Sequence, residues 1–435
     1  MDKLLANEID TIVNCGNKPR SISYEVILET VDCSIFVKKI ESVEILKDYN
    51  QNYADSFLVT VMIPLGDFVH KLYNQTDNME ISLVAVVGED TFEYRMKAMP
   101  VNSKVGVIGK DLLSKSIEEL NKESEMRLEL QCVSRVVEGM RAIYVDGIYK
   151  YTDVGSVIKA VLSDSLDKVI IDGDTPILEI DVVQSDNSNM YRHIKIPSGQ
   201  VMSLDLPTFL QNDEYGVYNG NIGTYIQYIN AKEKIFVYPL YNTLRFENEE
   251  KKLMLYNTPD IRYQHIDKTY MVDGDIVKIV TTSDIRVLNP AEDAMTDKGV
   301  GYVVNNSEGV ISKDLIIHDD TVTSAAELNM SGKKFKDRND GVNKPRYIGS
   351  ESNEYKIRSD FVKESMLFMQ VTWNFCNHEL IFPGMPVSFI FYNKDDVLRL
   401  NGTVLSGFYK YTEAAKTESM LLNIAVENPS FKKEE

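Results

Sequence analysis

The chain has 435 residues and a mass of 49.5 kDa, enough for two to four domains with cores of their own. Its 66 Asp and Glu against 47 Lys and Arg give a net charge of −19. This argues against a general nucleic-acid-binding protein, because such proteins neutralise phosphates with clustered Lys and Arg. Hydrophobic residues make up 43% and charged residues 26%, as in soluble globular proteins, so a wholly disordered chain is excluded.

The four cysteines, Cys15, Cys33, Cys132 and Cys376, lie far apart and form no CxxC pair. We therefore expect four separate buried thiols, and neither a disulfide framework nor a Cys-rich zinc site. No apolar run of about 18 residues is long enough to span a bilayer, so no membrane insertion is expected. The acids Glu8 and Asp10 interrupt the N-terminal segment, which lacks the layout of a signal peptide. Folding in a cytoplasm is the expectation.

The first third of the chain predicts antiparallel strands with one short helix. Residues 56–63 (SFLVTVMI) form a buried strand that ends at Pro64. Directly after it, apolar side chains recur at i, i+3, i+4 and i+7, one stripe of a short helix; they are Leu65, Phe68, Val69 and Leu72. This stripe is the expected packing and assembly helix of the first β region.

A hairpin follows this helix. The segments 81–87 and 91–98 flank the turn residues Gly88-Glu89-Asp90. Apolar and polar residues alternate along 92–98 and again along 126–132. One face of each strand is therefore expected to be buried and the other exposed to solvent. The region is predicted to be a β-sandwich or barrel.

The middle of the chain is mixed. An apolar stripe over 154–162 follows Asp153, a suitable N-cap, and predicts a helix. Pro207 suits the first turn of another helix. Strands are expected at 234–238, which Pro239 ends, and at 276–281.

Residues 284–364 differ from the rest, since their apolar runs are short and 320–360 is rich in Ser, Asn, Asp, Lys and Gly. We expect a polar inserted subdomain or a long loop. Strands return at the end of the chain, separated by turn residues; they cover 366–373, 387–392, 398–405 and 420–426.

Motifs for phosphate or dinucleotide binding are incomplete. Residues 106–110 (GVIGK) are too short for a phosphate loop, and Asp111 follows where Ser or Thr is needed. Gly299 and Gly301 lack the third glycine of a dinucleotide fingerprint. Both are interpreted as turns or loops, and no cofactor is expected.

Metal and catalytic motifs are also lacking. The five histidines show no HxxxH or HExxH spacing, and His318-Asp319-Asp320 is interpreted as a solvated loop. Asp172-Gly173-Asp174 and Asp273-Gly274-Asp275 resemble fragments of a calcium loop without its closing Glu, and are interpreted as turns. No GxSxG is present and no Cys lies in a recognisable Cys-His context. The sequence therefore nominates no catalytic, cofactor-binding or metal residue, and we expect a protein that is not an enzyme.

Four stretches, in their order along the chain, resemble the central baseplate hub proteins of contractile-tailed bacteriophages of the T-even kind. They are SFLVTVMIPLGDFVHKLYN with MEISLVAVVGEDTFEYRMKAM, SLDLPTFLQNDEYGVYNGN with KEKIFVYPLYNTLRF, RYIGSESNEYKIRSDFVKESM, and ELIFPGMPVSFIFYNKDDVLRLNGTVLSGFYKY. The last one contains the family-like PGxPV hairpin, with Pro383, Gly384, Pro386 and Val387.

The resemblance implies a mainly β (α+β) fold with two tail-tube-like β-barrel or sandwich domains, each with a short helix, a mixed middle domain and a polar insertion. The expected ranges are 1–134 for the first tube-like domain, 135–226 for the middle domain, 227–283 with 365–428 for the second tube-like domain, 284–364 for the insertion, and 429–435 for a frayed tail.

The resemblance further implies a homotrimeric ring in the virion baseplate, assembled in the cytoplasm of the host bacterium. The ring would adapt the hexameric tail tube to the trimeric central spike and contact neighbouring baseplate proteins. DNA would pass through the lumen without stable binding, since acidic walls repel phosphate. Two alternatives stay open at this point: a tail-associated hydrolase of cell wall or polysaccharide, and a receptor- or sugar-binding tail module suggested by 24 tyrosines.

Overall fold

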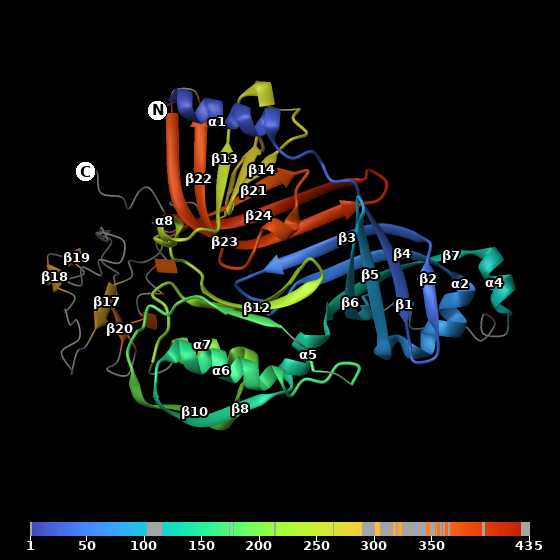
Figure 1. Ribbon diagram of the computed structural model, residues 1–435, viewed down its shortest axis with the longest axis horizontal. Coiled ribbons are helices and arrows are strands. Elements are labelled where there is room, and N and C mark those ends of the chain that lie inside the picture. The colour runs from blue at the N-terminus through green and yellow to red at the C-terminus, as the bar shows by residue number, and fades with distance from the viewer. Residues whose placement is uncertain are drawn as a thin grey trace.

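The computed structural model describes residues 2–101, 115–173, 175–176, 178–212, 215–263, 265–288, 301–304, 316–318, 321–323, 345–348, 353, 355–356, 359, 362–363, 366–393 and 396–427. The protein is mainly β, as predicted, with one large sheet system above a mixed layer of helices and short strands (Figure 1). Several sequence features lie outside the described residues, namely the glycine-rich loop 106–110, Asp174, Gly299, residues 319–320 and the tail 429–435.

The first β region is a closed barrel. Its strands are β1 (Ile22–Glu29), β2 (Ser34–Val37), β3 (Lys39–Asp48), β4 (Ser56–Pro64), β5 (Met79–Val87), β6 (Asp90–Pro100) and β7 (Glu125–Ser134). Antiparallel ladders run in the order β2–β1–β5–β6–β7–β4–β3. Only Lys38 separates β2 from β3, so one bent segment pairs with β1 and then with β4 and closes the ring. The predicted hairpin is confirmed, because Val87 pairs with Asp90 and Gly88 has a positive φ of 64°.

The predicted short helix after β4 is present but irregular. It begins as α2 (Leu65–Asp67), continues as the π-helical turn η1 (Phe68–Leu72) and ends as the 3₁₀ helix η2 (Tyr73–Asn78). A second helix, α4 (Ile117–Glu123), begins with a Ser116–Glu119 capping box and packs on α2, where the Asp67 amide donates to Asn121 Oδ1 at 3.1 Å.

The second β region holds the C-terminal strands predicted from the sequence. Its strands are β13 (Lys252–Asn257), β14 (Tyr270–Asp273), β15 (Ile276–Thr281), β16 (Arg286–Val287), β21 (Met366–Asn374), β22 (Pro386–Asn393), β23 (Asp396–Thr412) and β24 (Thr417–Glu427). The ladders run β14–β15–β13–β22–β23–β24–β21–β16. Side chains connect β15 to β21, because Thr281 Oγ1 donates to the Thr372 carbonyl at 2.7 Å.

One long strand joins the two β regions. The 17-residue strand β23 pairs with β22 through its first half and with β24 through its second half. The opposite edge of that second half pairs with β3 of the first region, from Ser406 opposite Asp48 to Thr412 opposite Ser42. Both regions therefore belong to a single 15-stranded sheet.

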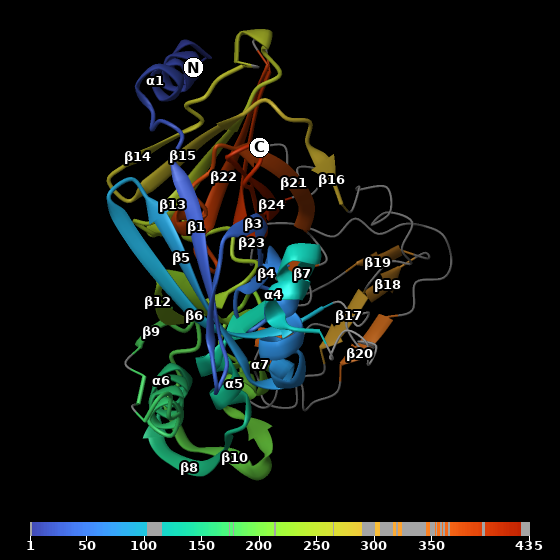
Figure 2. The same cartoon turned by 90° about the vertical axis from the view of Figure 1, so that its right-hand side faces the viewer.

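The middle of the chain packs beneath this sheet in layers (Figures 1 and 2). Its strands are β8 (Tyr144–Thr152), β9 (Glu179–Val182), β10 (Tyr191–Met202), β11 (Ile222–Ile229) and β12 (Lys232–Pro239). Its helices are α5 (Arg135–Arg141), α6 (Val154–Leu166), η4 (Ser203–Asp205) and α7 (Leu206–Asn212). Both predicted helices are present here, and the Asp153 side chain caps α6 by accepting from the Ser156 amide at 2.9 Å.

The hairpin β11–β12 separates two cores. Tyr225 and Tyr238 point into the core of the large sheet, whereas Ile226 and Ile235 point into the core of the middle layer. This alternation explains why nearly every residue of β11 is buried. The expected domain limit at 226/227 falls inside β11, and β12 also pairs with β9 of the middle layer. The domain ranges remain a proposal.

The N-terminal helix α1 (Asp2–Cys15) lies on the second β region (Figure 1). Its Leu5, Ile9 and Ile12 pack against Tyr256 and Ile390 on the outside of that sheet. None of the described helices is long and apolar enough to cross a membrane.

The remaining described elements are short. Residues 301–348 contain two small sheets, one of β17 (Gly301–Val304) with β20 (Pro345–Ile348) and one of β18 (Ile316–His318) with β19 (Thr321–Thr323). The remaining helices are α8 (Arg245–Asn248), η5 (Ile261–Tyr263) and η6 (His378–Leu380).

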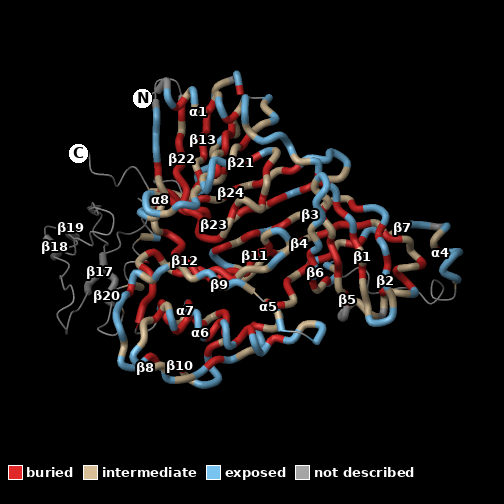
Figure 3. Tube along the Cα trace, in the orientation of Figure 1, coloured by how far each residue is buried: buried red, intermediate tan, exposed pale blue. Residues whose placement is uncertain are grey.

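Figure 3 shows which of the described residues are buried and which are exposed. Among the tyrosines whose burial the structure describes, fifteen are buried, which favours packing of strands over exposed aromatic platforms as the reason for their number. The expectation of four buried thiols is wrong for two of them. Cys132 and Cys376 are buried, but Cys15 is exposed at the end of α1 and Cys33 is partly exposed in the β1–β2 turn. Cys15 is the last residue of α1, and Cys33 lies in a turn and packs only partly against the core of the first barrel.

Candidate functional site: the junction of the two β regions

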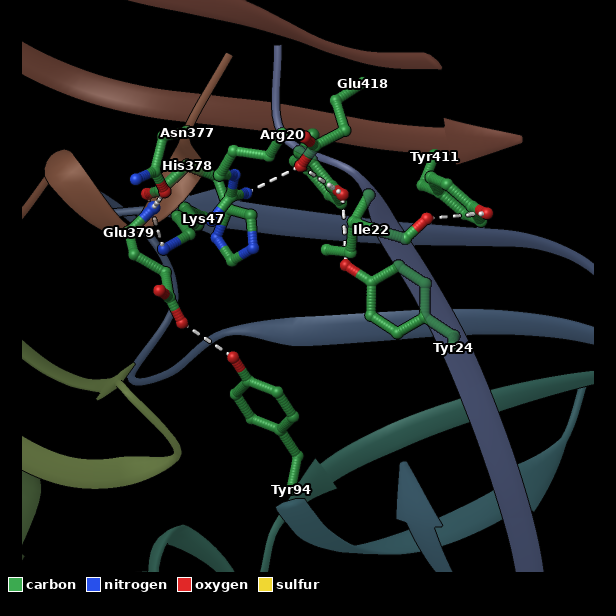
Figure 4. Close-up of polar contacts among 11 residues, drawn as sticks. Arg20, Ile22, Tyr24, Lys47, Tyr94, Asn377, His378, Glu379, Tyr411 and Glu418 are labelled. Carbon is green, nitrogen blue, oxygen red and sulfur yellow. Dashed lines mark hydrogen bonds and ion pairs between the residues drawn. The ribbon is translucent and has the colours of Figure 1, made fainter. Parts of the chain in front are cut away.

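A buried polar network lies where the two β regions meet, and we call it the junction. Its residues come from segments far apart in the sequence; they are Arg20, Tyr24, Lys47, Asp55, Tyr94, Tyr225, His378, Glu379, Tyr409 and Glu418. Figure 4 shows most of them between the two sheets. Because buried polar groups are costly without partners, the contacts of this network are the first place to look for function.

The centre of the junction is a fully buried ion pair. Lys47 Nζ lies 4.0 Å from Asp55 Oδ2, and the two side chains are 0% and 2% exposed. Asp55 also accepts from the Tyr225 hydroxyl at 3.0 Å and from the Tyr228 amide at 3.2 Å. Burial raises the pKa of Asp55 and lowers the pKa of Lys47, because it disfavours both charged forms, while the opposite charges partly offset this. Each member of the pair therefore offsets part of the cost of burying the other.

A second ion pair fixes the N-terminal segment to the end of the chain. Arg20 Nη2 lies 2.6 Å from Glu418 Oε1, which also accepts from the Tyr409 hydroxyl at 3.0 Å. The Tyr24 and Tyr409 hydroxyls are 3.0 Å apart. Burial raises the pKa of Glu418, and Arg20 opposes this rise through its charge. This chain of contacts ties β1 of the first region to β23 and β24 of the second.

The loop after β21 completes the junction. The Tyr94 hydroxyl of the first region donates to Glu379 Oε1 at 2.7 Å, and Lys47 Nζ donates to the His378 carbonyl at 3.3 Å. The His378 ring packs 4.3 Å from the Tyr409 ring, centroid to centroid. Burial lowers the pKa of His378 well below its usual range, so the ring is neutral at ordinary pH.

These buried ion pairs and hydrogen bonds suit a rigid connection between the two β regions better than a catalytic site. Lys47, Asp55, His378 and Glu418 are nearly inaccessible to solvent, and each ionised group faces a partner of the same chain. A catalytic acid or base must instead reach a substrate. Among the described residues, no group of three or more His, Cys, Asp or Glu is arranged to hold a metal ion. The junction is therefore a candidate assembly element that makes the two β regions one rigid body.

The helix residues predicted from the sequence lie elsewhere. Phe68, Val69 and Leu72 are buried in the core of the first barrel, and Leu65 is partly buried against it. They pack on their own barrel, and their role in assembly remains a proposal.

The hairpin residues Pro383, Gly384, Pro386 and Val387 are buried beside β12. Gly384 has φ of 65°, packs on the Tyr238 ring, and its carbonyl accepts from Arg245 Nη1 at 2.7 Å. Val387 pairs with Leu253 of β13 and with Gly402 of β23. These hairpin residues therefore lie where β12 meets the second β region. The structure does not bring them together with the helix residues Leu65, Phe68, Val69 and Leu72.

The junction residues were not nominated from the sequence, although two of them carried a signal. Lys47 follows Val43 and Ile45 at alternating positions, and Glu418 precedes Met420 and Leu422 in the same way. A charged residue in phase with the apolar face of a strand is a candidate for a buried ion pair. Asp55 and Arg20 carried no such signal, because they lie just outside strands.

Comparison with family models and with curated proteins yields no match. Solved structures that are similar to the chain include tail proteins and a component of a type VI secretion system. A 43 kDa tail protein of prophage MuSo2 from Shewanella oneidensis has a TM-score of 0.48 and 9% identity, covering 92% of this chain and 96% of that chain. A tail protein from Neisseria meningitidis MC58 has a TM-score of 0.48 and 9% identity, covering 94% and 98%. The E. coli c3393 protein, a type VI secretion component described as similar to bacteriophage T4 tail proteins, has a TM-score of 0.44 and 8% identity, covering 93% and 78%.

Proposed function

We propose that the chain is a structural protein of a phage tail baseplate, and that three copies form a hub ring between the hexameric tail tube and the trimeric central spike. The observation that carries the proposal is the ladder between β3 and β23, which joins two β regions into one sheet. A subunit that holds two barrel-like units side by side can present six such units from three copies, and this matches a hexameric neighbour to a trimeric one.

The joint itself supports this role. An adapter ring must keep its two β regions at a fixed angle. In addition to the ladder, the junction supplies the Arg20–Glu418 ion pair between distant segments, and Lys47 Nζ of the first region donates to the His378 carbonyl of the second. The net charge of −19 suits a lumen that lets DNA pass without binding it. The tail tube, the central spike and neighbouring baseplate proteins are the partners that follow from this role.

The test is the mass of the purified full chain by size exclusion with light scattering, followed by electron microscopy of the peak. The expected result is a mass near three times 49.5 kDa and a ring with six similar units around its hole. A chain that stays monomeric at every concentration, and also after addition of the tail tube and spike proteins, contradicts the proposal.

The same sample distinguishes the hydrolase alternative. A zymogram of bacterial cell wall should stay uncleared at the position of this chain. Clearing there, lost when the chain is heat-denatured, would replace the structural assignment with an enzymatic one.

A further inference from the structure

We propose that the outer face of the β8–β10 ribbon binds an acidic segment of a partner protein that also carries apolar side chains. The ribbon is the antiparallel pair β8 and β10, and its outer face is the side turned away from α6 and α7. In Figures 1 and 2 the ribbon forms the lower rim of the molecule, with these helices between it and the large sheet.

The inner face of the ribbon is fully occupied. Val145, Ile194, Ile196 and Val201 are buried in the core that α6 and α7 share. The Lys195 amide also donates to the Tyr215 hydroxyl at 2.9 Å, which fixes the backbone of β10. The side chains of the outer face therefore project from a rigid frame, as a binding surface requires.

The outer face concentrates positive charge in an acidic chain. The register places His193 opposite Lys150 and Lys195 opposite Ile148, so the two lysines are diagonal neighbours on one face. Lys150, His193 and Lys195 are exposed, and so is Arg192, whose position in β10 alternates with the outer-face residues and lies on the opposite face. Within the described part of the chain none of these four forms an ion pair with a carboxylate, although the chain carries 66 acids.

One acid lies on the same two strands. Asp146 accepts a hydrogen bond from Ser198 Oγ at 2.6 Å, and Ser198 belongs to the irregularity in β10 between Ile196 and Val201. Asp146 and Lys150 are each two residues from Ile148, which lies opposite Lys195, so both are diagonal neighbours of Lys195 on this face. The Asp146 carboxylate is engaged by Ser198. Lys150 and His193 lie directly opposite each other, and neither has a carboxylate partner in the described part of the chain, so an acidic segment would supply one.

Apolar side chains lie among these charges. Tyr144 is 59% exposed and Ile148 61%, and both alternate along β8 with Lys150, so they belong to the same face. Exposed apolar groups gathered on one rigid face mark a protein-binding surface. They favour a protein over a nucleic acid as the occupant, because so few cations cannot match a phosphate backbone against a net charge of −19.

The test uses the full chain and a short fluorescein-labelled peptide of Asp and Glu with Leu and Phe side chains, followed by fluorescence anisotropy. We expect saturable binding that weakens severalfold when salt rises from about 50 to about 200 mM. Three comparison probes are a peptide with Lys in place of the acids, a peptide with Ser in place of Leu and Phe, and single-stranded DNA. Each should bind at least about tenfold more weakly.

Charge reversal on the ribbon provides the matched comparison. The double variant K150E/K195E should lose at least about tenfold in affinity for the acidic peptide, and I148S should lose severalfold. The control K18E/K251E makes the same charge change at exposed lysines elsewhere and should bind like the parent chain. All variants should keep the parent's circular dichroism and thermal midpoint.

Several results would overturn the proposal. Absent binding of the acidic peptide, equal binding of the lysine peptide, stronger binding of DNA, or equal losses in the ribbon and control variants would each do so. Concentration-dependent self-association that K150E/K195E abolishes would identify a second copy of this chain as the occupant instead. The trimeric mass is measured separately, so it can fail without affecting this outcome.

Discussion

Lys47 Nζ lies 4.0 Å from Asp55 Oδ2, with both side chains buried between two β regions that are far apart in the sequence. The pair faces the Tyr225 hydroxyl and the Tyr228 amide on one side and the His378 carbonyl on the other. It therefore connects β3, the hairpin β11–β12 and the loop after β21 through ionised groups.

The substitution Lys47→Met should destabilise the protein by about 3–5 kcal/mol, because it leaves the Asp55 carboxylate buried without a counter-charge. The double variant K47M/D55N should recover much of this loss. Urea unfolding of the parent chain, both single variants and the double variant would measure the coupling between the two residues. Additive effects would show that the pair is not an energetic unit.

The Arg20–Glu418 contact should control the mobility of the N-terminal segment. Arg20→Met removes a charged hydrogen bond worth about 1.5–3 kcal/mol, so the segment between α1 and β1 should open more often. We expect faster cleavage after Lys18 by a lysine-specific protease. The control Arg127→Met removes exposed pairs with Glu41 and Glu129 and should leave the cleavage rate at Lys18 unchanged.

Glu233 should give the protein an unusual dependence of stability on pH. Burial raises the pKa of Glu233 from 4.5 to about 6, although Ser134 and Tyr228 donate hydrogen bonds to it. The unfolded chain then loses this proton at lower pH than the folded chain, so the contribution of Glu233 to stability falls as pH rises from about 4.5 to about 6. The fall is about 2 kcal/mol.

The variant Glu233→Gln isolates this effect, because every other titrating group is common to both proteins. The difference in unfolding free energy, variant minus parent, should increase by about 2 kcal/mol between pH 4 and pH 6.5. A difference that stays constant over this range would refute the assignment.

Gly384 should tolerate alanine poorly for two separate reasons. Its φ of 65° disfavours any side chain, and a Cβ would collide with the Tyr238 ring. Gly274 has a φ of 61° and open space around it, so Gly274→Ala reports the backbone cost alone, about 1 kcal/mol. Gly384→Ala should cost about 1–3 kcal/mol more, from the forced shift of Tyr238. Equal thermal midpoints for the two variants would contradict this packing.

The strands of the two β regions were predictable because each carries its own period-two pattern. Phe92 to Ala98 and Met420 to Val426 show it without help from distant residues. The helix at 154–166 was predictable for the same local reason, with Asp153 as its cap.

Other features could not be predicted, because they depend on contacts between residues that are far apart in the sequence. Helix α1 was not predicted, although Leu5, Ile9 and Ile12 have helical spacing and pack against Tyr256 and Ile390 of the second region. The hairpin β11–β12 lies between two cores, so its buried residues do not reveal which core each strand face serves. The junction depends on the pairing of β3 with β23, and no local pattern specifies which strand a free edge will meet.

The ladder between β3 and β23 can form only late in synthesis, because β23 leaves the ribosome long after β3. Lys410 and Glu44, which form an ion pair across it, are 366 residues apart. At a synthesis rate of about 5–20 residues per second, the edge of β3 waits roughly 20 to 70 s for its partner strand to leave the ribosome. During that interval the first barrel exposes an unpaired strand edge, the kind of surface that promotes aggregation. A nascent chain stalled before residue 396 should therefore need a chaperone to stay monomeric, whereas the completed chain should not.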